Sequence, residues 1–534
     1  MKAGWMFWTA ALALCAALAA AAIGSAAQES QTFDESTHLG AGYAQLVLGE
    51  TRLNVEHPPL AKLLSAAAVL PLGPRMERTG KGWEPLDENI VGKEFLYRSG
   101  VAPDRLLTRG RLPTIALAMA LVLAVAVWTR RFFGVGAGLF AAFLCAFDPN
   151  VIAHGRYVTN DLHLTLFLFL ACMSWSAWLE GDRLRDLAGA ALWTGLALVS
   201  KFSAVILAPV LGALYVVAWV RNPGQFPVRR MGRAAAVLAG TAAVVLMLAY
   251  LPASARSSGG ALRYVTAPFA MWAHGFAAYW EHNAAGQPAY LMGKLSDTGW
   301  WYFFPVVFAV KTPTAVLVLL AVGAVMALRR VHARAAFAWW AVTIPLLAYG
   351  AAVLTSNINL GVRHLLPVYP FLFALLAGIV FRLRSPLTVA IVAVVVLLEA
   401  VESMRVYPHY LAFFNTPSGG PANGAAWLVD SSLDWGQDLR KLRTWWDASG
   451  HPKLCLRYFG APDPSEFGFR WETLPETNDL ATRAETDCIG AVSATLLKDV
   501  YVPPGAYQWL RDRQPIGNIG YSIYLYDLRK PKQP

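Results

Sequence analysis

The sequence has little charge for its length. Asp, Glu, Lys and Arg make up 15% of its 534 residues, whereas about 25% is usual in soluble globular proteins. Hydrophobic residues make up 56%. This composition excludes a single soluble globule and indicates that a bilayer surrounds part of the chain. The formal net charge of +11 is spread over short Arg-bearing loops, so it reflects membrane topology and argues against a nucleic-acid-binding patch.

Cysteine is scarce, and the five cysteines show no metal-ligand spacing. Cys15, Cys145 and Cys172 lie in apolar segments, where they are expected to act as small hydrophobic residues. Cys455 and Cys488 share an aqueous segment. They can form a disulfide if that segment is extracytoplasmic and their geometry matches; otherwise they stay free. The sequence also lacks a fixed-period repeat and a low-complexity linker, so the tail is expected to dock closely on the core.

Apolar runs dominate the chain, and about eleven of them approach the 17 to 25 residues needed to cross a bilayer. Their approximate ranges are 5–27, 112–128, 135–152, 162–178, 187–200, 203–220, 234–252, 303–327, 336–354, 366–381 and 386–402. The predicted fold class is therefore an α-helical polytopic membrane protein.

The short loops between these runs alternate in charge. Arg-rich loops mark one side, which is cytoplasmic by the positive-inside rule. They contain Arg130 and Arg131, Arg183 and Arg185, Arg221 through Arg233, Arg329, Arg330 and Arg334, and Arg382 and Arg384. The N-terminus is then cytoplasmic. A cleaved secretory signal is the alternative reading of residues 1–27, and it also leaves the following loop outside.

This topology divides the chain into a membrane core and an extracytoplasmic tail. The core covers 1–402 and includes extracytoplasmic loops at 28–111 and 253–302; the tail, 403–534, is predicted to be a small α/β domain. Within the first loop, 58–72 is apolar enough to form a helix in the membrane interface. In the tail, the pattern predicts strands at 426–429, 454–458 and 521–526 and a helix over 433–446.

Polar residues gather directly after the first span. Phe33-Asp34-Glu35-Ser36-Thr37-His38 is followed by Glu56-His57-Pro58-Pro59-Leu60-Ala61-Lys62. Asp34 could simply cap a short helix. The two prolines hold the preceding residues extended, which suits the presentation of polar groups, although the motif alone is also compatible with a turn.

These two stretches resemble the first luminal loop of the protein O-mannosyltransferases (dolichyl-phosphate-mannose-protein mannosyltransferases). More broadly, they resemble the C-type (GT-C) membrane glycosyltransferases, which include the lipid A aminoarabinose transferases. The resemblance continues through the membrane core in Phe147-Asp148-Pro149, His154-Gly155, Thr159-Asn160-Asp161, Ser200-Lys201-Phe202, Gly299-Trp300-Trp301-Tyr302, Gly361 through Pro367, and Asp430 through Gln437. It implies a GT-C fold and a polyprenyl-phosphate-linked sugar donor. The chain lacks the β-trefoil insert of the eukaryotic-type enzymes, so the resemblance does not carry over a protein acceptor.

The resemblance also implies catalytic carboxylates. Asp34 matches the acidic residue that follows the first helix and would remove the proton from the acceptor hydroxyl in an inverting transfer. Glu35 would orient Asp34 or share its hydrogen bonds. Asp161 matches a second acidic residue of the family, with capping of the following helix as the alternative.

Four cations are candidates for binding the donor phosphate, whose developing charge is poorly solvated at membrane depth. They are Lys62, Arg111, Lys201 and Arg363. Lys62 and Arg111 lie near membrane entries and could instead reach lipid headgroups. Lys201 and Arg363 stand at predicted outer helix ends, against the positive-inside pattern, and this favours a function for them.

Further residues are candidates for substrate binding. Lys311 lies inside a predicted span, where an ionisable residue indicates a functional site and a buried salt bridge is the alternative. The other candidates are Glu56, His57, His364, Asp430 and Asp434, although Asp434 could instead cap the predicted helix. Histidines 57, 154 and 364 do not have the spacing of a zinc motif. No cofactor and no metal are predicted, and a divalent ion remains the alternative.

The leading hypothesis is a membrane glycosyltransferase on the outer face of a bacterial inner membrane. It would move a hexose or pentose from a polyprenyl-phosphate donor to a hydroxyl of a protein, a lipid or an envelope glycan. The alternative is a transporter or flippase of lipid-linked sugars, which would also need intramembrane cations. A transporter is expected to show two related halves, and the sequence shows no such symmetry.

Overall fold

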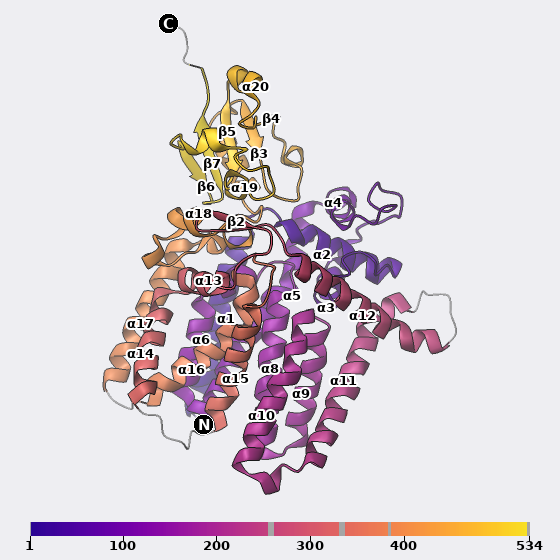
Figure 1. Cartoon of the computed structure of the whole chain (residues 1–534), viewed down its shortest axis with the longest axis vertical. Helices are drawn as coiled ribbons and strands as arrows, with labels where there is room; N and C mark the ends of the chain where they lie inside the picture. Colours follow the sequence, from indigo (N-terminus) through magenta and orange to yellow (C-terminus); the bar gives the residue numbers. More distant parts are fainter. Residues whose placement is uncertain (1, 255–260, 330–336, 383–385, 531–534) are drawn as a thin grey trace.

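The computed structural model describes residues 2–254, 261–329, 337–382 and 386–530. Figure 1 shows a bundle of long helices with a β-sheet domain at one end, while α1 (Lys2–Ala26) begins at the other. Arg130 and Arg131, predicted to lie in a loop, are in the last turn of α5 (Pro103–Phe133). The Arg130 guanidinium lies 4.3 Å from the Phe7 ring centroid, so these arginines lie at the end of the bundle where α1 begins. Residues 255–260 of the second predicted loop, and the predicted loop residues 330, 334 and 384, lie outside the described residues.

Each predicted span coincides with a helix or a helix pair. The bundle contains α1, α5 (Pro103–Phe133), α6 (Val135–Phe147), α7 (Pro149–His154), α8 (Asp161–Gly181), α9 (Leu184–Leu198), η3 (Phe202–Ile206), α10 (Leu207–Arg221), α11 (Val228–Ser254), α13 (Phe303–Lys311), α14 (Thr314–Arg329), α15 (Phe337–Val353), η5 (Val362–Val368), α16 (Tyr369–Arg382) and α17 (Pro386–Val406). By length and composition, 6 described helices can cross a membrane, or 7 if one bent pair counts as a single span. The predicted multi-pass helical class is confirmed.

The bent pair corrects the predicted straight span at 303–327. Helices α13 and α14 meet at 112°, with Pro313 at the break, where it cannot donate a backbone hydrogen bond. Asn150 Nδ2 donates to the Lys311 carbonyl at 2.7 Å, and Asn415 Nδ2 donates to the Thr312 carbonyl at 2.8 Å. These amides satisfy carbonyls that the broken helix leaves free.

Short helical segments and the longer helix α12 lie between the bundle and the sheet domain (Figure 1). They are α2 (Phe33–Tyr43), η1 (Ala44–Leu48), α3 (Leu60–Val69), η2 (Leu70–Leu72), α4 (Glu88–Arg98) and α12 (Ala261–Ala285), followed by the hairpin β1 (Ala289–Leu291) and β2 (Lys294–Ser296). Helix α3 is the helix predicted within 58–72, and its 10 residues are too few to cross a bilayer, which takes about 20.

The C-terminal sheet has five strands in the order β4-β3-β5-β7-β6. They are β3 (Leu454–Arg457), β4 (Trp471–Thr473), β5 (Ile489–Ser493), β6 (Gly517–Ile519) and β7 (Ile523–Asp527). Strands β4, β3 and β5 are parallel, and β7 is antiparallel to β5 and β6. The predicted strands at 454–458 and 521–526 correspond to β3 and β7.

Two other predictions for the tail are wrong. Residues 426–429 do not form a strand, because Gly424–Trp427 is the short helix α18. The predicted helix at 433–446 begins later, as α19 (Leu439–Ala448), because Asp430–Ser432 forms the 3-10 turn η9 and Leu433 ends it. Leu439, Leu442 and Trp446 share one face of α19 and pack against the sheet.

Backbone hydrogen bonds join the C-terminal segment to the start of α2. The Ser30 amide donates to the Gln437 carbonyl at 2.9 Å, and the Phe33 amide donates to the Trp435 carbonyl at 2.8 Å. The buried Glu29 carboxylate accepts from Arg156 at 2.8 Å. The segment before α2 is therefore held by both the membrane bundle and the tail.

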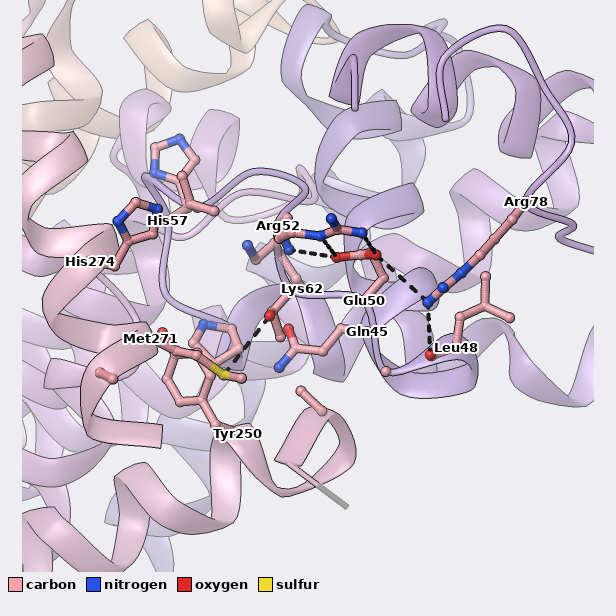
Figure 2. A pocket seen from close by; sticks show the side chains of 16 residues that line it. Gln45, Leu48, Glu50, Arg52, His57, Lys62, Arg78, Tyr250, Met271 and His274 are labelled. Atoms are coloured by element: carbon pink, nitrogen blue, oxygen red, sulfur yellow. Dashed lines mark hydrogen bonds and ion pairs between the residues drawn. The ribbon is translucent and has the colours of Figure 1, made fainter. Parts of the chain in front are cut away.

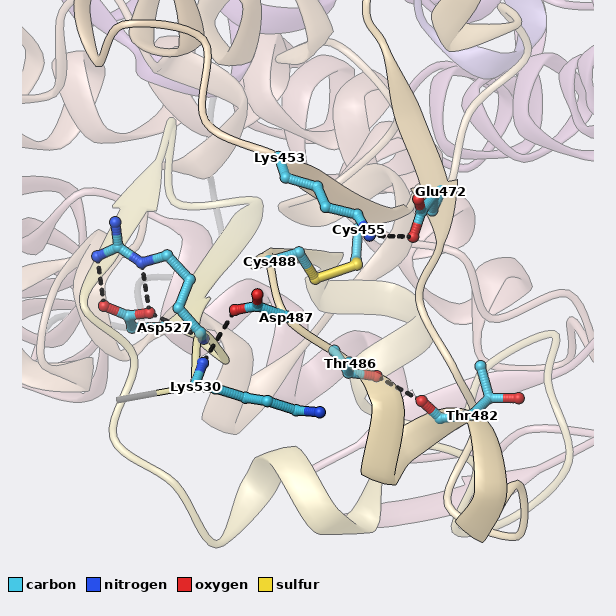
Figure 3. The surroundings of a disulfide bond; sticks show 10 residues. Lys453, Cys455, Glu472, Thr482, Thr486, Asp487, Cys488, Asp527 and Lys530 are labelled. Carbon is cyan, nitrogen blue, oxygen red and sulfur yellow. Dashed lines mark hydrogen bonds and ion pairs between the residues drawn. A yellow bond between two sulfur atoms is a disulfide. The ribbon is translucent and has the colours of Figure 1, made fainter. Parts of the chain in front are cut away.

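Cys455 and Cys488 form a disulfide between β3 and the residue before β5 (Figure 3). The sequence left open whether these two cysteines pair or stay free, and the structure shows them paired. Cys15, Cys145 and Cys172 are free and buried.

The disulfide predicts how many cysteines react with a thiol reagent before and after reduction. Maleimide labelling of the purified protein in SDS without reductant should modify only Cys15, Cys145 and Cys172, and labelling after reduction should modify all cysteines, read by mass spectrometry. In a matched Cys172→Ala control, both counts should fall by one. Complete labelling without reductant would contradict the pairing.

Candidate active site

The two adjacent carboxylates of α2 point to different partners. Successive residues of an α-helix are about 100° apart around its axis, because one turn takes 3.6 residues. Asp34 Oδ2 accepts from Arg363 at 2.8 Å, and both side chains are partly accessible. Glu35 turns inward and binds Arg111. Only Asp34 of the pair is therefore open to a substrate.

Glu35 and Arg111 form a buried clamp. Arg111 donates through Nε and Nη2 to the two oxygens of Glu35 at 2.8 and 2.7 Å, and the side chains are 3% and 0% exposed. Glu35 also accepts from the amides of Thr32 and Val158 at 2.9 and 3.0 Å. Arg111 further donates to the carbonyls of Ala26 and Ser30, both at 2.9 Å.

This geometry favours the first of the two roles predicted for Glu35, orienting Asp34, and corrects the role predicted for Arg111. Glu35 binds Arg111 and two backbone amides, so it positions α2 and does not share hydrogen bonds with Asp34. Arg111 is buried, and its N–H groups donate hydrogen bonds to Glu35 and to backbone carbonyls. It is therefore not positioned to bind a lipid phosphate.

Asp161 and Lys201 form a second ion pair. Asp161 is the first residue of α8, Lys201 directly precedes η3, and Lys201 Nζ donates to Asp161 Oδ1 at 2.5 Å. Asn160, and not Asp161, is the N-cap of α8, so the Asp161 carboxylate is available to Lys201. The charges of Asp34 and Asp161 both act on Arg363, which places the two acidic residues around one group of cations.

Two histidines lie beside this group. His38 follows Asp34 by one helical turn and stacks on His57, with 4.9 Å between the ring centroids. Burial lowers the pKa of His38 to about 4 and lowers the pKa of His57 well below its ordinary value. Both rings are therefore neutral near pH 7. His38 was not predicted, although its i, i+4 spacing from Asp34 in the sequence marks the same helix face.

A cavity of about 500 Å³ opens beside Asp34, and we call it the Asp34 cavity. It lies between the membrane bundle and the C-terminal domain. Its polar lining includes Asp34, Arg363, Asp430, Arg457, Gln287 and Tyr501, and its aromatic lining includes Phe33, Trp435, Tyr458 and Phe459. The Arg363 guanidinium lies 4.5 Å from the Trp435 ring centroid, so the ring supports the arginine that holds Asp34.

A second cavity of about 500 Å³ opens beside Lys62 (Figure 2), and we call it the Lys62 cavity. It lies between the first loop and helices α11 and α12, and its basic lining residues are Arg52, His57, Lys62, Arg78 and His274. Lys62 Nζ donates to the Asn54 carbonyl at 2.7 Å, and burial lowers the pKa of Lys62 to about 7. Glu50 lies 2.7 Å from Arg52 and 3.6 Å from Arg78.

Contacts between rings connect the two cavities. His57 lines the Lys62 cavity and stacks on His38, which lies one turn of α2 from Asp34 in the other cavity. The arginines of the Lys62 cavity, its His274, and Tyr501 and Phe459 of the Asp34 cavity were not predicted. These residues lie in loops and in α12, outside the sequence motifs from which the site was predicted.

Two predicted substrate-binding residues, Glu56 and Lys311, lie elsewhere. Glu56 pairs with His282 of α12 at 2.6 Å and lines neither cavity. Lys311 is fully buried at the end of α13, where Nζ donates to the carbonyls of Leu411 and Ser432 at 2.9 and 2.7 Å. It supports the chain at the helix break, lines neither cavity, and forms no salt bridge with any residue that the structure describes.

The remaining predicted residues divide between the cavity and the protein interior. Asp434 is buried and accepts from the Thr495 amide at 2.9 Å, so it neither lines the Asp34 cavity nor caps α19. Burial raises the pKa of Asp434 to about 8. Asp430 does line the Asp34 cavity. His364 follows Arg363 and stacks on Phe304, with 6.1 Å between the ring centroids.

No arrangement of metal ligands is present in the described part of the chain, where no three His, Cys, Asp or Glu side chains gather around one point. The site therefore consists of two carboxylate–cation pairs, neutral histidines and two cavities.

Comparisons with known proteins agree with this fold. Residues 106–251 match the family model described as dolichyl-phosphate-mannose-protein mannosyltransferase. The structure is similar to that of ArnT from Cupriavidus metallidurans bound to undecaprenyl phosphate, with a TM-score of 0.51, 12% identity and 100% of each chain covered. It also matches the apo oligosaccharyltransferase of Archaeoglobus fulgidus, with a TM-score of 0.49, 13% identity, and 85% of this chain and 60% of that chain covered. A search of curated proteins found no match.

Fold and site thus define a multi-pass membrane protein with the fold of the C-type glycosyltransferases. The predicted resemblance is confirmed as well: the chain resembles the dolichyl-phosphate-mannose-protein mannosyltransferases, whose family model matches the segment from α5 to α11.

The contrast between Arg111 and Arg363 predicts different effects on stability. Arg111→Ala leaves Glu35 charged, buried and unpaired, which should destabilise the protein by about 3–5 kcal/mol. Arg363→Ala should cost much less, because Asp34 and Arg363 are partly accessible to water. Thermal unfolding of both purified variants in the same detergent checks this. Equal losses would contradict the assignment of Arg111 as the structural cation.

Proposed function

We propose that the protein transfers a sugar from a polyprenyl-phosphate-linked donor to an acceptor hydroxyl, with inversion at the anomeric carbon and Asp34 as general base. The observation that carries the proposal is the Asp34–Arg363 pair at 2.8 Å in the wall of a cavity. A carboxylate held by one cation, next to space for a substrate, suits a base that must be oriented and accessible.

The reaction balances with Asp34 as its only proton acceptor. The acceptor oxygen forms a bond to the anomeric carbon while the bond from that carbon to the phosphate oxygen breaks. The hydroxyl proton passes to the Asp34 carboxylate, and the lipid phosphate leaves with the bonding electrons. Negative charge therefore moves from Asp34 to the phosphate, and cations near the phosphate lower the barrier because they stabilise the charge that develops there.

Arg363, Lys201 and Lys62 are the cations that we assign to the phosphate. Buried Nε of Arg363 has no partner in the described part of the chain, so this arginine retains a donor for a substrate oxygen. The Lys62 cavity lies beside the end of α11, a helix long enough to span the membrane. A lipid phosphate could reach the lysine there while its chain stays in the bilayer. Asp161 would hold Lys201 in place and act as a positioning residue.

The site would face the extracytoplasmic side of a bacterial inner membrane, with the N-terminus in the cytoplasm. Two observations support this orientation. Arg130 and Arg131 lie at the end of the bundle where α1 begins, as the positive-inside rule requires. The disulfide lies in the sheet domain at the opposite end (Figures 1 and 3), and disulfides persist in oxidising compartments. The donor sugar would be a hexose or a pentose, and the acceptor a protein, lipid or glycan hydroxyl.

Replacing Asp34 tests the base directly. Asp34→Asn keeps the shape of the side chain and removes its basicity, so transfer from a radiolabelled polyprenyl-phosphate sugar to membrane or envelope acceptors should fall by about 10² to 10⁴ fold. The matched control is Asp182→Asn, which changes an exposed carboxylate at the C-cap of α8. Full activity in Asp34→Asn would contradict the assignment.

Lys62 predicts a pH dependence of donor binding. Its pKa of about 7 means that the ammonium is charged below that pH and neutral above it, whereas a phosphodiester donor stays anionic throughout. Affinity for a polyprenyl-phosphate sugar should therefore fall as pH rises from 6 to 8.5. Lys62→Arg keeps its charge over this range and should flatten the profile. The same slope in wild type and Lys62→Arg would remove Lys62 from the phosphate site.

A further inference from the structure

Two residues in the wall of the Asp34 cavity have unusual backbones. Asp430 has φ of +53° and Tyr501 has φ of +63°. Such angles are uncommon for residues with a Cβ, and they are strained for a bulky one such as tyrosine. Strain of this kind is retained where the surrounding structure enforces it, often at functional sites.

The side chains of these two residues meet inside the cavity. The Tyr501 hydroxyl donates to Asp430 Oδ2 at 2.8 Å and accepts from Gln287 Nε2 at 3.0 Å. All three residues line the Asp34 cavity. Asp430 has no ion pair among the described residues, so its carboxylate keeps acceptor capacity for a ligand.

Aromatic rings continue from Tyr501 to the proposed base. Tyr501 stacks on Phe459 with 5.3 Å between centroids and 12° between planes, and Phe459 stacks on Phe33 with 5.5 Å and 12°. Phe33 directly precedes Asp34. The cavity therefore combines a wall of nearly parallel rings, which we call the aromatic column, with a hydrogen-bonding group at its far end.

We propose that the Asp430–Tyr501 pair and the aromatic column bind a carbohydrate ring in the Asp34 cavity. The inference rests on the proposed function and names Tyr501 as a residue that determines which ring is accepted. A sugar ring presents hydroxyls at its edge and C–H groups on its faces. Asp430 accepts hydrogen bonds from the hydroxyls, Tyr501 and Gln287 fix the carboxylate, and the aromatic column packs against the C–H face.

A purely structural role explains these contacts less well. The C-terminal segment is already joined to α2 by the backbone bonds of Ser30 and Phe33 and by the buried Glu29–Arg156 pair. Tyr501 remains 40% exposed, so it adds little to the hydrophobic core. A strained and exposed tyrosine that orients a buried carboxylate is better explained by a ligand.

The test uses the purified full-length protein in detergent and a panel of methyl glycosides of mannose, glucose, galactose, N-acetylglucosamine and arabinose. Saturation-transfer difference NMR should detect ring protons of at least one glycoside. Tyr501→Phe keeps the ring and removes one hydroxyl, so affinity for that glycoside should fall about five- to tenfold, as expected for one lost hydrogen bond. Asp430→Asn should weaken binding at least as much.

The control is Tyr526→Phe, which removes the hydroxyl of a buried tyrosine that does not line the cavity; its affinity should equal that of wild type. Absence of binding by every glycoside, or wild-type affinity in Tyr501→Phe, would overturn the inference. Loss of the proposed function would appear as full transfer activity in Asp34→Asn, which is a separate result.

The same assay distinguishes the two sources of the ring. If it belongs to the donor, added polyprenyl-phosphate sugar should displace the methyl glycoside, and Tyr501→Phe should raise the KM for donor. If it belongs to a glycan acceptor, the donor should leave the glycoside bound, and the variant should raise the KM for acceptor. Each result supports carbohydrate binding and names its source.

Discussion

The buried ion pair between Glu35 and Arg111 determines the geometry of the site. Glu35 is fully enclosed, and its oxygens are bound by a guanidinium and two backbone amides. Removing either charge would leave the other unpaired at low dielectric, so the start of α2 has little freedom to rotate. The neighbouring residue, Asp34, is consequently held toward the cavity and Arg363. One carboxylate of the pair is structural, and its fixed position leaves the other open to a substrate.

The C-terminal segment completes the site that α2 begins. The Trp435 ring packs against the Arg363 guanidinium, and the Trp435 carbonyl accepts a hydrogen bond from the Phe33 amide. Asp430 and Tyr501 form another part of the wall of the Asp34 cavity. The basic Lys62 cavity lies between the first loop and helices α11 and α12. Under the proposed function, the donor phosphate and the hydroxyl-bearing substrate would occupy different cavities, which separates the leaving group from the nucleophile.

The sequence predicted the parts of this arrangement that depend on local pattern. Apolar runs located the helices, and the position of Asp34 after the first helix, together with the unusual cations Lys201 and Arg363, located the centre of the site. It could not show that Glu35 is held by Arg111, because these residues are 76 positions apart in the chain. The pairing of Asp430 with Tyr501, 71 residues apart, and the burial of Lys311 at a helix break likewise depend on tertiary contacts. No local pattern carries that information.

The stereochemistry of transfer tests the central claim most directly. If Asp34 removes the acceptor proton while the acceptor attacks the anomeric carbon, displacement occurs in one step and the configuration at that carbon inverts. The measurement is ¹H NMR of the initial product formed from a polyprenyl-phosphate sugar of known anomeric configuration. The account predicts the opposite anomer in the product. A product with the donor's configuration would require a different use of Asp34 and would contradict the account.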